Sequence, residues 1–295
     1  MSATAHLLVR GRRVCAFLAA LSLIALLVSS AGTARASTAT ASIVGGYRPD
    51  PTQWPWLAAI AKSPKSAPGE SAFARQKCGG TLINPRLVLT AAHCAVDSRG
   101  RPLRPGALSV ILGRDYLAVS DGDEISVRAV RVFHHFRLSR MRNDVALLLL
   151  SRPSTQPTAL FANPQVPLTE GQMATAMGWG AVVENPGASD YPPSRLAVDV
   201  PLWSDDQCRT DQETETPYDP ASMLCAGYPE GGHDTCQGDS GGPLMIQVGE
   251  EWQLVGIVSF GNGCAAPEHP GFYAWVSGPR LFGWINKQGS ALLTT

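Results

Sequence analysis

The feature that most constrains the fold is a succession of short apolar runs that begins after Ile43 and continues almost to the end of the chain. Gly, Pro, Asn and Asp clusters separate the runs and predict turns. Short β-rich runs with this punctuation predict strands of an all-β barrel or sandwich, and no long helical segments alternate with them. The strands are expected at 56–61, 81–83, 87–90, 109–112, 127–133, 145–150, 174–177, 196–200, 243–248, 252–260 and 271–276.

Two short helices and three surface loops complete the expected organisation. Ser204 and Gln207 have the spacing of a capping box, which predicts a helix through Cys208. Residues 280–287 place apolar side chains on one helical face. Composition predicts surface loops at 63–77, 183–193 and 213–220. About 250 residues after position 42 can hold two barrels, with a hinge after Leu150.

The N-terminus has the pattern of an export signal. Three arginines, at 10, 12 and 13, precede an apolar run over 14–28, and residues 34–36 read Ala-Arg-Ala, the form of a signal peptidase site. The alternative is a transmembrane anchor, but the run is shorter than the roughly 20 residues that span a bilayer. We therefore expect a signal peptide at 1–36, a short Ser/Thr/Ala segment at 37–42, a folded domain at 43–295 and secretion from the cell. Sec and twin-arginine export both remain open.

Cysteine usage points to disulfides. The chain has seven cysteines, and Cys15 leaves with the signal peptide. An even set in an exported chain predicts disulfide bonds, although six cysteines allow 15 pairings. A metal site is disfavoured because no C-x-x-C pair occurs and His93 lacks a second ligand at zinc-finger spacing. The remaining cysteines are Cys78, Cys94, Cys208, Cys225, Cys236 and Cys264.

Charge limits the class of partner. Lys plus Arg and Asp plus Glu both number 24, so no overall field favours nucleic acid or an anionic membrane. Partner choice must therefore come from a local site.

Three motifs supply groups that can activate a hydroxyl. They are LTAAHC with His93, NDVALLLL with Asp144 and GDSGGP with Ser240. Each has an ordinary structural interpretation, as a core histidine, a strand cap or a surface turn. Together they provide a nucleophile, an imidazole base and a carboxylate that orients the base. The glycines around Ser240 also allow backbone N–H groups to approach a reacting atom.

With these motifs, and with IVGG and GWG in the same order, residues 43 to about 286 resemble a trypsin-like serine protease of the chymotrypsin family, closest in character to secreted bacterial members. The resemblance implies two packed six-stranded antiparallel β-barrels with a short C-terminal helix and an active site between the barrels. It gives the catalytic roles to Ser240, His93 and Asp144. Gly238 and Ser240 would form the oxyanion hole, and Ser259 would support the aspartate and the substrate chain.

The resemblance also implies specificity and pairs the cysteines. Asp234 would lie at the base of the primary pocket between the small wall residues Gly261 and Gly271, and a buried carboxylate there would select Arg or Lys before the cut. The implied disulfides are Cys78–Cys94, Cys208–Cys225 and Cys236–Cys264.

Activation is expected to involve Ile43 and Asp239. The resemblance makes 37–42 a short propeptide and 43–295 a trypsin-like peptidase domain. In the family, the aspartate before the nucleophile pairs with the new N-terminal ammonium, here that of Ile43 after cleavage. Ser42 departs from the basic residue found there in animal trypsinogens, so another protease that accepts small residues would make the cut. Arg114 stands where calcium-binding relatives have an acid, so Glu124 and Asp121 do not predict a calcium site, and no cofactor is expected.

The expected function is thus a secreted serine endopeptidase that cleaves after Arg or Lys through an acyl-enzyme. Its partners would be polypeptide substrates, protein protease inhibitors and an activating protease, with no nucleic acid and no membrane. A monomer is the default state. The alternative is a protease-like binding module without catalysis, but the residues that such modules lose are all present.

Overall fold

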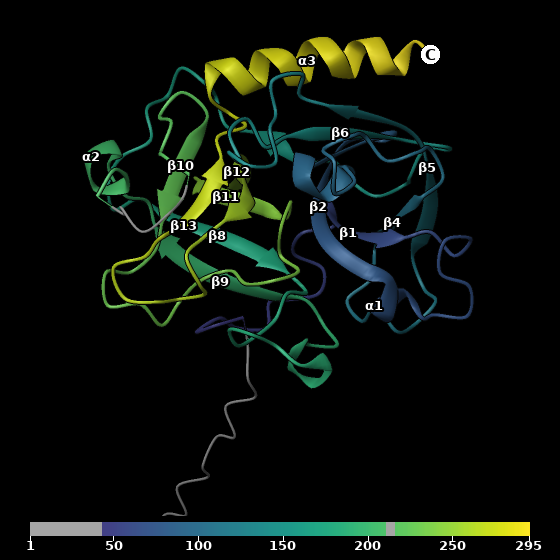
Figure 1. The fold of residues 1–295 in the computed structure, drawn as a ribbon, viewed down its shortest axis with the longest axis horizontal. Helices are drawn as coiled ribbons and strands as arrows, with labels where there is room; N and C mark the ends of the chain where they lie inside the picture. The colour runs from purple at the N-terminus through teal and green to yellow at the C-terminus, as the bar shows by residue number, and fades with distance from the viewer. Residues whose placement is uncertain (1–42, 211–215) are drawn as a thin grey trace, which may run out of the picture. The chain divides into compact units, whose positions relative to one another are not determined.

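The computed structural model describes residues 43–210 and 216–295, so the predicted signal peptide and propeptide lie outside the described residues. The first group of strands forms a closed antiparallel barrel in the order β1-β2-β3-β6-β5-β4 (Figure 1). Its strands are β1 (Leu57–Lys62), β2 (Gln76–Asn84), β3 (Leu87–Thr90), β4 (Leu108–Leu112), β5 (Asp123–Val132) and β6 (Ala146–Leu150).

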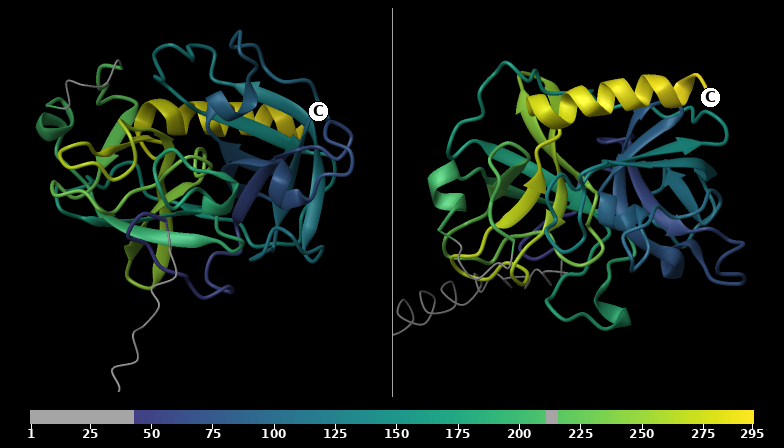
Figure 2. Two further views of the ribbon diagram at one scale, coloured as in Figure 1. Left: turned by 60° about the horizontal axis from the view of Figure 1, so that its bottom comes forward. Right: turned by 45° about the horizontal axis from the view of Figure 1, so that its top comes forward.

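The second group of strands forms a curled sheet in the order β10-β13-β12-β11-β8-β9, and β7 adds to β12 in parallel. Figure 2 shows this green-to-yellow group on the opposite side of the described chain from the blue-to-teal barrel. Its strands are β7 (Leu160–Phe161), β8 (Met173–Gly178), β9 (Leu196–Pro201), β10 (Met223–Ala226), β11 (Pro243–Val248), β12 (Glu251–Phe260) and β13 (Gly271–Ala274).

The predicted all-β fold with a C-terminal helix is confirmed, but the second sheet, predicted as a six-stranded barrel, is a curled half-barrel that is open at one seam. Its end strands, β9 and β10, meet only through the Leu202–Ala226 bridge and a few neighbouring hydrogen bonds. Pro201 ends β9 and has no N–H to extend a ladder there. The sheet therefore curls until its edges touch, without a continuous row of hydrogen bonds between them.

The helices are α1 (Ala72–Arg75), α2 (Asp205–Cys208) and α3 (Pro279–Leu293), together with the 3-10 helices η1 (Ala92–Ala95) and η2 (Ala188–Asp190). The capping box of α2 is confirmed, because Ser204 Oγ accepts from the Gln207 N–H and Gln207 Oε1 accepts from the Ser204 N–H. The predicted loop at 63–77 is corrected, since it contains α1 and the start of β2. Residues 211–215 of the third predicted loop lie outside the described residues.

Helix α3 covers the outer face of the first barrel, where it runs alongside β6 in Figure 1. Every residue of β6 is buried, because the barrel interior covers one face and α3 the other. Gly289 permits this approach, since a Cβ at that position would come within 3.2 Å of Leu87 Cδ1. Apolar packing continues to Leu292, which explains why α3 extends beyond the predicted 280–287. No helix among the described residues is long and apolar enough to span a membrane.

Three disulfides join the pairs that the family resemblance implied: Cys78–Cys94, Cys208–Cys225 and Cys236–Cys264. The first lies next to His93, and the third joins the segment that contains Asp234 to the loop after β12. Each cross-link of this kind typically stabilises a fold by about 2 to 4 kcal/mol.

Candidate active site

Strand pairing in the first barrel brings His93 and Asp144 together. His93 lies in η1, just after β3, and Asp144 lies just before β6. Because β3 and β6 are antiparallel, with Thr90 opposite Ala146, the end of one strand lies beside the start of the other. Two residues that are 51 positions apart in the sequence thus reach hydrogen-bond distance.

Asp144 holds the histidine at two points. One carboxylate oxygen accepts the His93 backbone N–H at 2.9 Å, and the other lies 2.7 Å from His93 Nδ1. Asp144 is completely buried, so this pairing is shielded from water. A carboxylate only accepts hydrogen bonds, so the ring proton is assigned to Nδ1 and Nε2 is left as a base.

Opposing effects act on the pKa of His93. Burial lowers it, whereas the charge and hydrogen bond of Asp144 raise it, and the net shift is upward from the usual value. The imidazole is therefore a stronger base than a free histidine, and Asp144 stabilises the imidazolium that proton transfer would create.

Ser259 adds a contact from the other sheet. It lies on β12, and its Oγ donates to Asp144 Oδ2 at 2.6 Å. The buried carboxylate thus receives donors from both strand groups, which fixes its orientation toward His93. The role of Ser259 in binding the substrate chain stays a prediction.

Ser240 is held close to the same region by its backbone. Its carbonyl accepts from the N–H of Gly79, which directly follows the disulfide-bonded Cys78 on β2. Across the described residues, no hydrogen bond joins Ser240 Oγ to the His93 ring. Catalytic hydrogen bonds are often long without substrate and shorten when substrate binds, so the predicted Ser240–His93 pair does not require this bond in the unbound protein.

Gly238 has the backbone conformation required for an anion-binding turn. Its φ is +101°, and a Cβ would approach Gly180 Cα to 3.1 Å and the Tyr191 ring to 3.3 Å. Its carbonyl accepts from Gln76 Nε2 at 2.9 Å, which fixes the peptide plane. The N–H groups of Gly238 and Ser240 donate to no described residue, so both can donate to a substrate oxygen.

Asp234 lies in a pocket of about 200 Å³ that Ser240 and Ser259 also line. The residue is 4% exposed, and its carboxylate accepts from the backbone N–H groups of Thr235 and Ala265. Burial is the main cause that raises the pKa of Asp234 to about 7. No basic side chain lines the described pocket, so the ionised carboxylate lacks a counter-ion there.

The two predicted wall glycines differ in how strictly they are required. A Cβ at Gly271 would lie 2.7 Å from Asp234 Oδ1, so any side chain there would displace the carboxylate. A Cβ at Gly261 would find only ordinary contacts of 3.4 Å or more. Gly261 therefore leaves space in the pocket, whereas Gly271 is needed for Asp234 to occupy its position.

Two residues near the site were not predicted from the sequence. Tyr273 is fully buried on β13, close to Asp234. Its hydroxyl oxygen would lie 3.2 Å from a Cβ placed on Gly271. Burial raises the pKa of Tyr273, so it stays neutral. Gln76 supports the Gly238 carbonyl from β2. Neither has a local sequence signal, because each reaches the site only through strand pairing.

Asp239 points into the protein. It is fully buried and accepts from the N–H groups of Gly180 at 2.8 Å and Cys236 at 3.0 Å. Burial raises its pKa to about 6. Ile43 is also fully buried, and the next residue, Val44, accepts the Asp234 N–H at 3.1 Å. The described residues show no hydrogen bond between the Ile43 nitrogen and Asp239; in the uncleaved chain that nitrogen is an uncharged amide.

The groups nearest to metal-ligand geometry have other partners. Cys78, Cys94 and His93 lie close together, but the cysteines form a disulfide and offer no thiolate. Glu124 accepts from Arg75 at 2.8 and 3.0 Å and from Ser109 at 2.7 Å. The carboxylate considered for calcium is therefore engaged by a guanidinium.

Comparison with known proteins agrees with this geometry. The family described as Trypsin matches residues 43–285. The chain is 37% identical to a trypsin of Saccharopolyspora erythraea, over 68% of this chain and 83% of that protein. It is 36% identical to Trypsin-1 of Astacus astacus, over 70% of this chain and 85% of that protein. Identity is 34% to a proclotting enzyme of Tachypleus tridentatus, with 84% of this chain aligned to 66% of that protein. The protein therefore belongs to the trypsin family of chymotrypsin-like serine proteases.

Proposed function

We propose that this protein is a secreted endopeptidase that cleaves peptide bonds after Arg or Lys through an acyl-enzyme intermediate. The observation that carries the proposal is the buried Asp144–His93 pair, joined by two hydrogen bonds, together with a pocket lined by Ser240 and by the Asp234 carboxylate, which has no counter-ion there. Family membership supports peptide-bond hydrolysis, and the relatives named as trypsins support the finer substrate class.

The proposed reaction uses Ser240 as nucleophile, His93 as base and two backbone N–H groups as oxyanion donors. His93 Nε2 takes the proton from Ser240 Oγ as that oxygen attacks the carbonyl carbon, which gives a tetrahedral oxyanion. The N–H groups of Gly238 and Ser240 stabilise this oxyanion. His93 then donates the proton to the leaving amine, the C–N bond breaks and the acyl group stays on Ser240. Water, deprotonated by His93, hydrolyses the ester and restores the enzyme.

Specificity follows from the cost of the Asp234 charge. A buried carboxylate without a counter-ion is unfavourable, and an arginine or lysine side chain that enters the pocket supplies one. An apolar side chain would leave the charge unpaired. Asp234 and Ser240 line the same pocket of about 200 Å³, so a long, unbranched cationic side chain bound beside the nucleophile would reach the carboxylate.

A panel of matched peptides tests the function directly. The chain that starts at Ile43 is expected to cleave peptides with Arg or Lys before the cut at least about 100-fold faster than peptides with Phe or Ala. Hydrolysis rates under one set of conditions provide the measurement. If a disulfide-bonded sample with a free Ile43 amine cleaves nothing, the rival function, a binding module without catalysis, would be favoured.

We further propose that a propeptide at 37–42 keeps the protein inactive until cleavage before Ile43. The buried Asp239 carboxylate has two N–H donors and no cationic partner among the described residues. A new ammonium at Ile43 would supply the missing charge. Because the Val44 carbonyl accepts a hydrogen bond from the Asp234 N–H, movement of this segment would be transmitted to the specificity pocket. Ser42 makes self-cleavage at this bond unfavourable, so a different protease would activate the precursor.

Activation can be tested with two chains that differ by one residue. A chain that begins at Ser42 is expected to be at least about 100-fold less active than one that begins at Ile43, because its amine lies one residue from the pairing position. Asp239→Asn is expected to reduce activity similarly in the Ile43 chain. Equal activity of the Ser42 and Ile43 chains would contradict the mechanism.

The proposed pair of the Ile43 ammonium and the Asp239 carboxylate also predicts an alkaline limit of activity. An α-amine has a pKa of about 7.7 to 8.0 when unpaired, and a carboxylate partner raises it in the folded state. The stabilisation from this ion pair is complete at pH values below the pKa of the unpaired amine. It is lost as pH rises through the higher pKa of the amine in the folded state. Activity of the Ile43 chain should therefore decline at strongly alkaline pH, in step with loss of the ordered pocket.

Export is supported by the predicted signal peptide, and the three disulfides are typical of an oxidising compartment. Protein substrates with exposed Arg or Lys residues and protein protease inhibitors are the proposed partners, with no nucleic acid or membrane after removal of the signal peptide. A monomer is the proposed state.

A further inference from the structure

A second hollow lies beside the oxyanion hole. It has a volume of about 580 Å³ and shares Gln237 with the Asp234 pocket. Its border includes Gly238, whose N–H is proposed to bind the substrate oxygen. In the proposed function the residue before the cleaved bond occupies the Asp234 pocket and its carbonyl oxygen accepts from the Gly238 N–H, so the chain after that bond would continue past Gly238. This hollow therefore lies where the leaving part of the substrate would pass.

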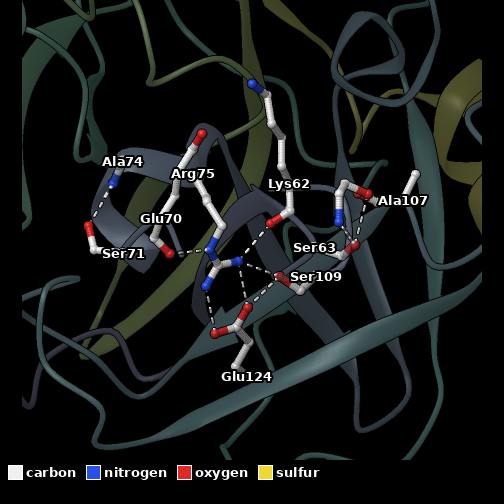
Figure 3. Close-up of polar contacts among 10 residues, drawn as sticks. Lys62, Ser63, Glu70, Ser71, Ala74, Arg75, Ala107, Ser109 and Glu124 are labelled. Carbon is white, nitrogen blue, oxygen red and sulfur yellow. Dashed lines mark hydrogen bonds and ion pairs between the residues drawn. The ribbon is translucent and has the colours of Figure 1, made fainter. Parts of the chain in front are cut away.

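One wall of the hollow is the segment from Phe73 to Lys77, which Arg75 anchors to the barrel through the contacts drawn in Figure 3. Arg75 is 4% exposed and donates to the carbonyls of Lys62 and Glu70, while both Glu124 oxygens accept from its guanidinium. The next residue, Gln76, donates to the Gly238 carbonyl. The contacts of Arg75 and Gln76 thus fix the backbone of this wall to the barrel and to the oxyanion loop before substrate binds.

Lys77 brings an unpaired positive charge to this wall. It forms no ion pair with any described residue, and no acidic residue lines the hollow. Ala188 and Tyr191 line the opposite wall. The carboxylate between them in sequence, that of Asp190, accepts from the Gly187 N–H. Burial and the nearby charge of Lys62 lower the pKa of Lys77, and its charge opposes protonation of His93. The ammonium therefore lies within electrostatic range of the predicted base.

We propose that Lys77 is a specificity-determining residue that selects an Asp or Glu side chain at one of the two positions directly after the cleaved bond. The inference rests on the proposed endopeptidase function and extends it to the leaving side of the substrate. An acidic side chain in the hollow would pair with Lys77 and offset its repulsion from Lys62. A basic side chain there would add a third positive charge. The preferred substrate thus has a basic residue before the cut and an acidic one just after it.

Peptides that share an Arg before the cut and carry Glu, Ala or Lys at each of the next two positions test this selection. Wild type is expected to show kcat/KM about 10-fold higher for Glu than for Ala at one position, and lower still for Lys. In Lys77→Gln the Glu-to-Ala ratio should approach one, and in Lys77→Glu the order of Glu and Lys should reverse. Because each ratio compares substrates within one sample, partial misfolding of a variant does not alter it.

Lys287→Gln is the matched control, since it removes a lysine on the exposed side of α3 and should keep the wild-type ratio. Raising the salt concentration should reduce the preference for Glu in wild type. Cleavage of Arg peptides without a Glu preference, or a preference that persists in Lys77→Gln, would overturn the role of Lys77 alone. Absence of all cleavage would contradict the proposed function and, with it, this inference.

Discussion

Ser240→Ala is expected to lower kcat on Arg peptides by about 10⁶-fold. The serine oxygen would form the bond to the acyl group, and alanine offers no nucleophile for His93 to activate. The oxyanion donors and the Asp234 pocket remain, so the variant should still bind peptide. The structure predicts little change in folding, because the backbone contact of Ser240 with Gly79 does not depend on its hydroxyl. Single-turnover and steady-state hydrolysis would provide the measurement.

Ser290→Ala is the matched control, because it removes an exposed hydroxyl on α3, outside the segment that contains Ser240. It should retain the wild-type kcat. A serine-directed fluorophosphonate should label wild type and the control, but not Ser240→Ala. If Ser240→Ala kept activity within about 10-fold of wild type, the acyl-enzyme mechanism would be wrong.

Asp234→Ser is expected to lower kcat/KM for Arg and Lys peptides by about 10² to 10⁴, which corresponds to loss of one partner of a buried ion pair. Cleavage after Phe or Ala should continue at its low background rate, since the residues of the His93 network are untouched. The preference would then change while the chemistry is retained. Comparison of the four peptides in the wild type and the variant measures both effects at once.

Asp206→Ser is the control for this prediction, because its carboxylate is exposed on α2 and its one ion pair with a described residue is with Arg209 at the surface. It should not alter the Arg-to-Phe ratio. Retention of the full Arg and Lys preference in Asp234→Ser would show that another group reads the substrate cation.

The shifted pKa of Asp234 gives a stability test with a defined sign. Its folded value of about 7 exceeds the unfolded value of about 3.9, so the folded state binds the proton more tightly. The cost of the ionised carboxylate is absent below about pH 4 and complete above about pH 7. Asp234→Ser should therefore raise Tm more at pH 8 than at pH 4. Binding of an arylamidinium inhibitor to wild type should weaken as pH falls below about 7.

Strand positions were largely predictable from local patterns. Alternating or continuous apolar runs located β3 and β11 to the residue, and the Ser204–Gln207 spacing located α2. Helix α1 was missed because it lies in a Ser- and Pro-rich stretch and depends on the contacts of Arg75 with β1 and β5. The short strands β7 and β10 were missed for a similar reason, since pairing with neighbours defines them more than hydropathy does.

The sequence by itself determined which chemical groups this protein carries and which family it resembles, because the His93, Asp144 and Ser240 motifs are local and specific. Only the tertiary structure decided how those groups meet. The β3–β6 pairing brings Asp144 to His93, strand β12 adds Ser259, and strand β2 brings Gln76 and Lys77 beside Gly238. Such contacts join residues far apart in the chain. They depend on strand register and packing, which no short stretch of sequence specifies.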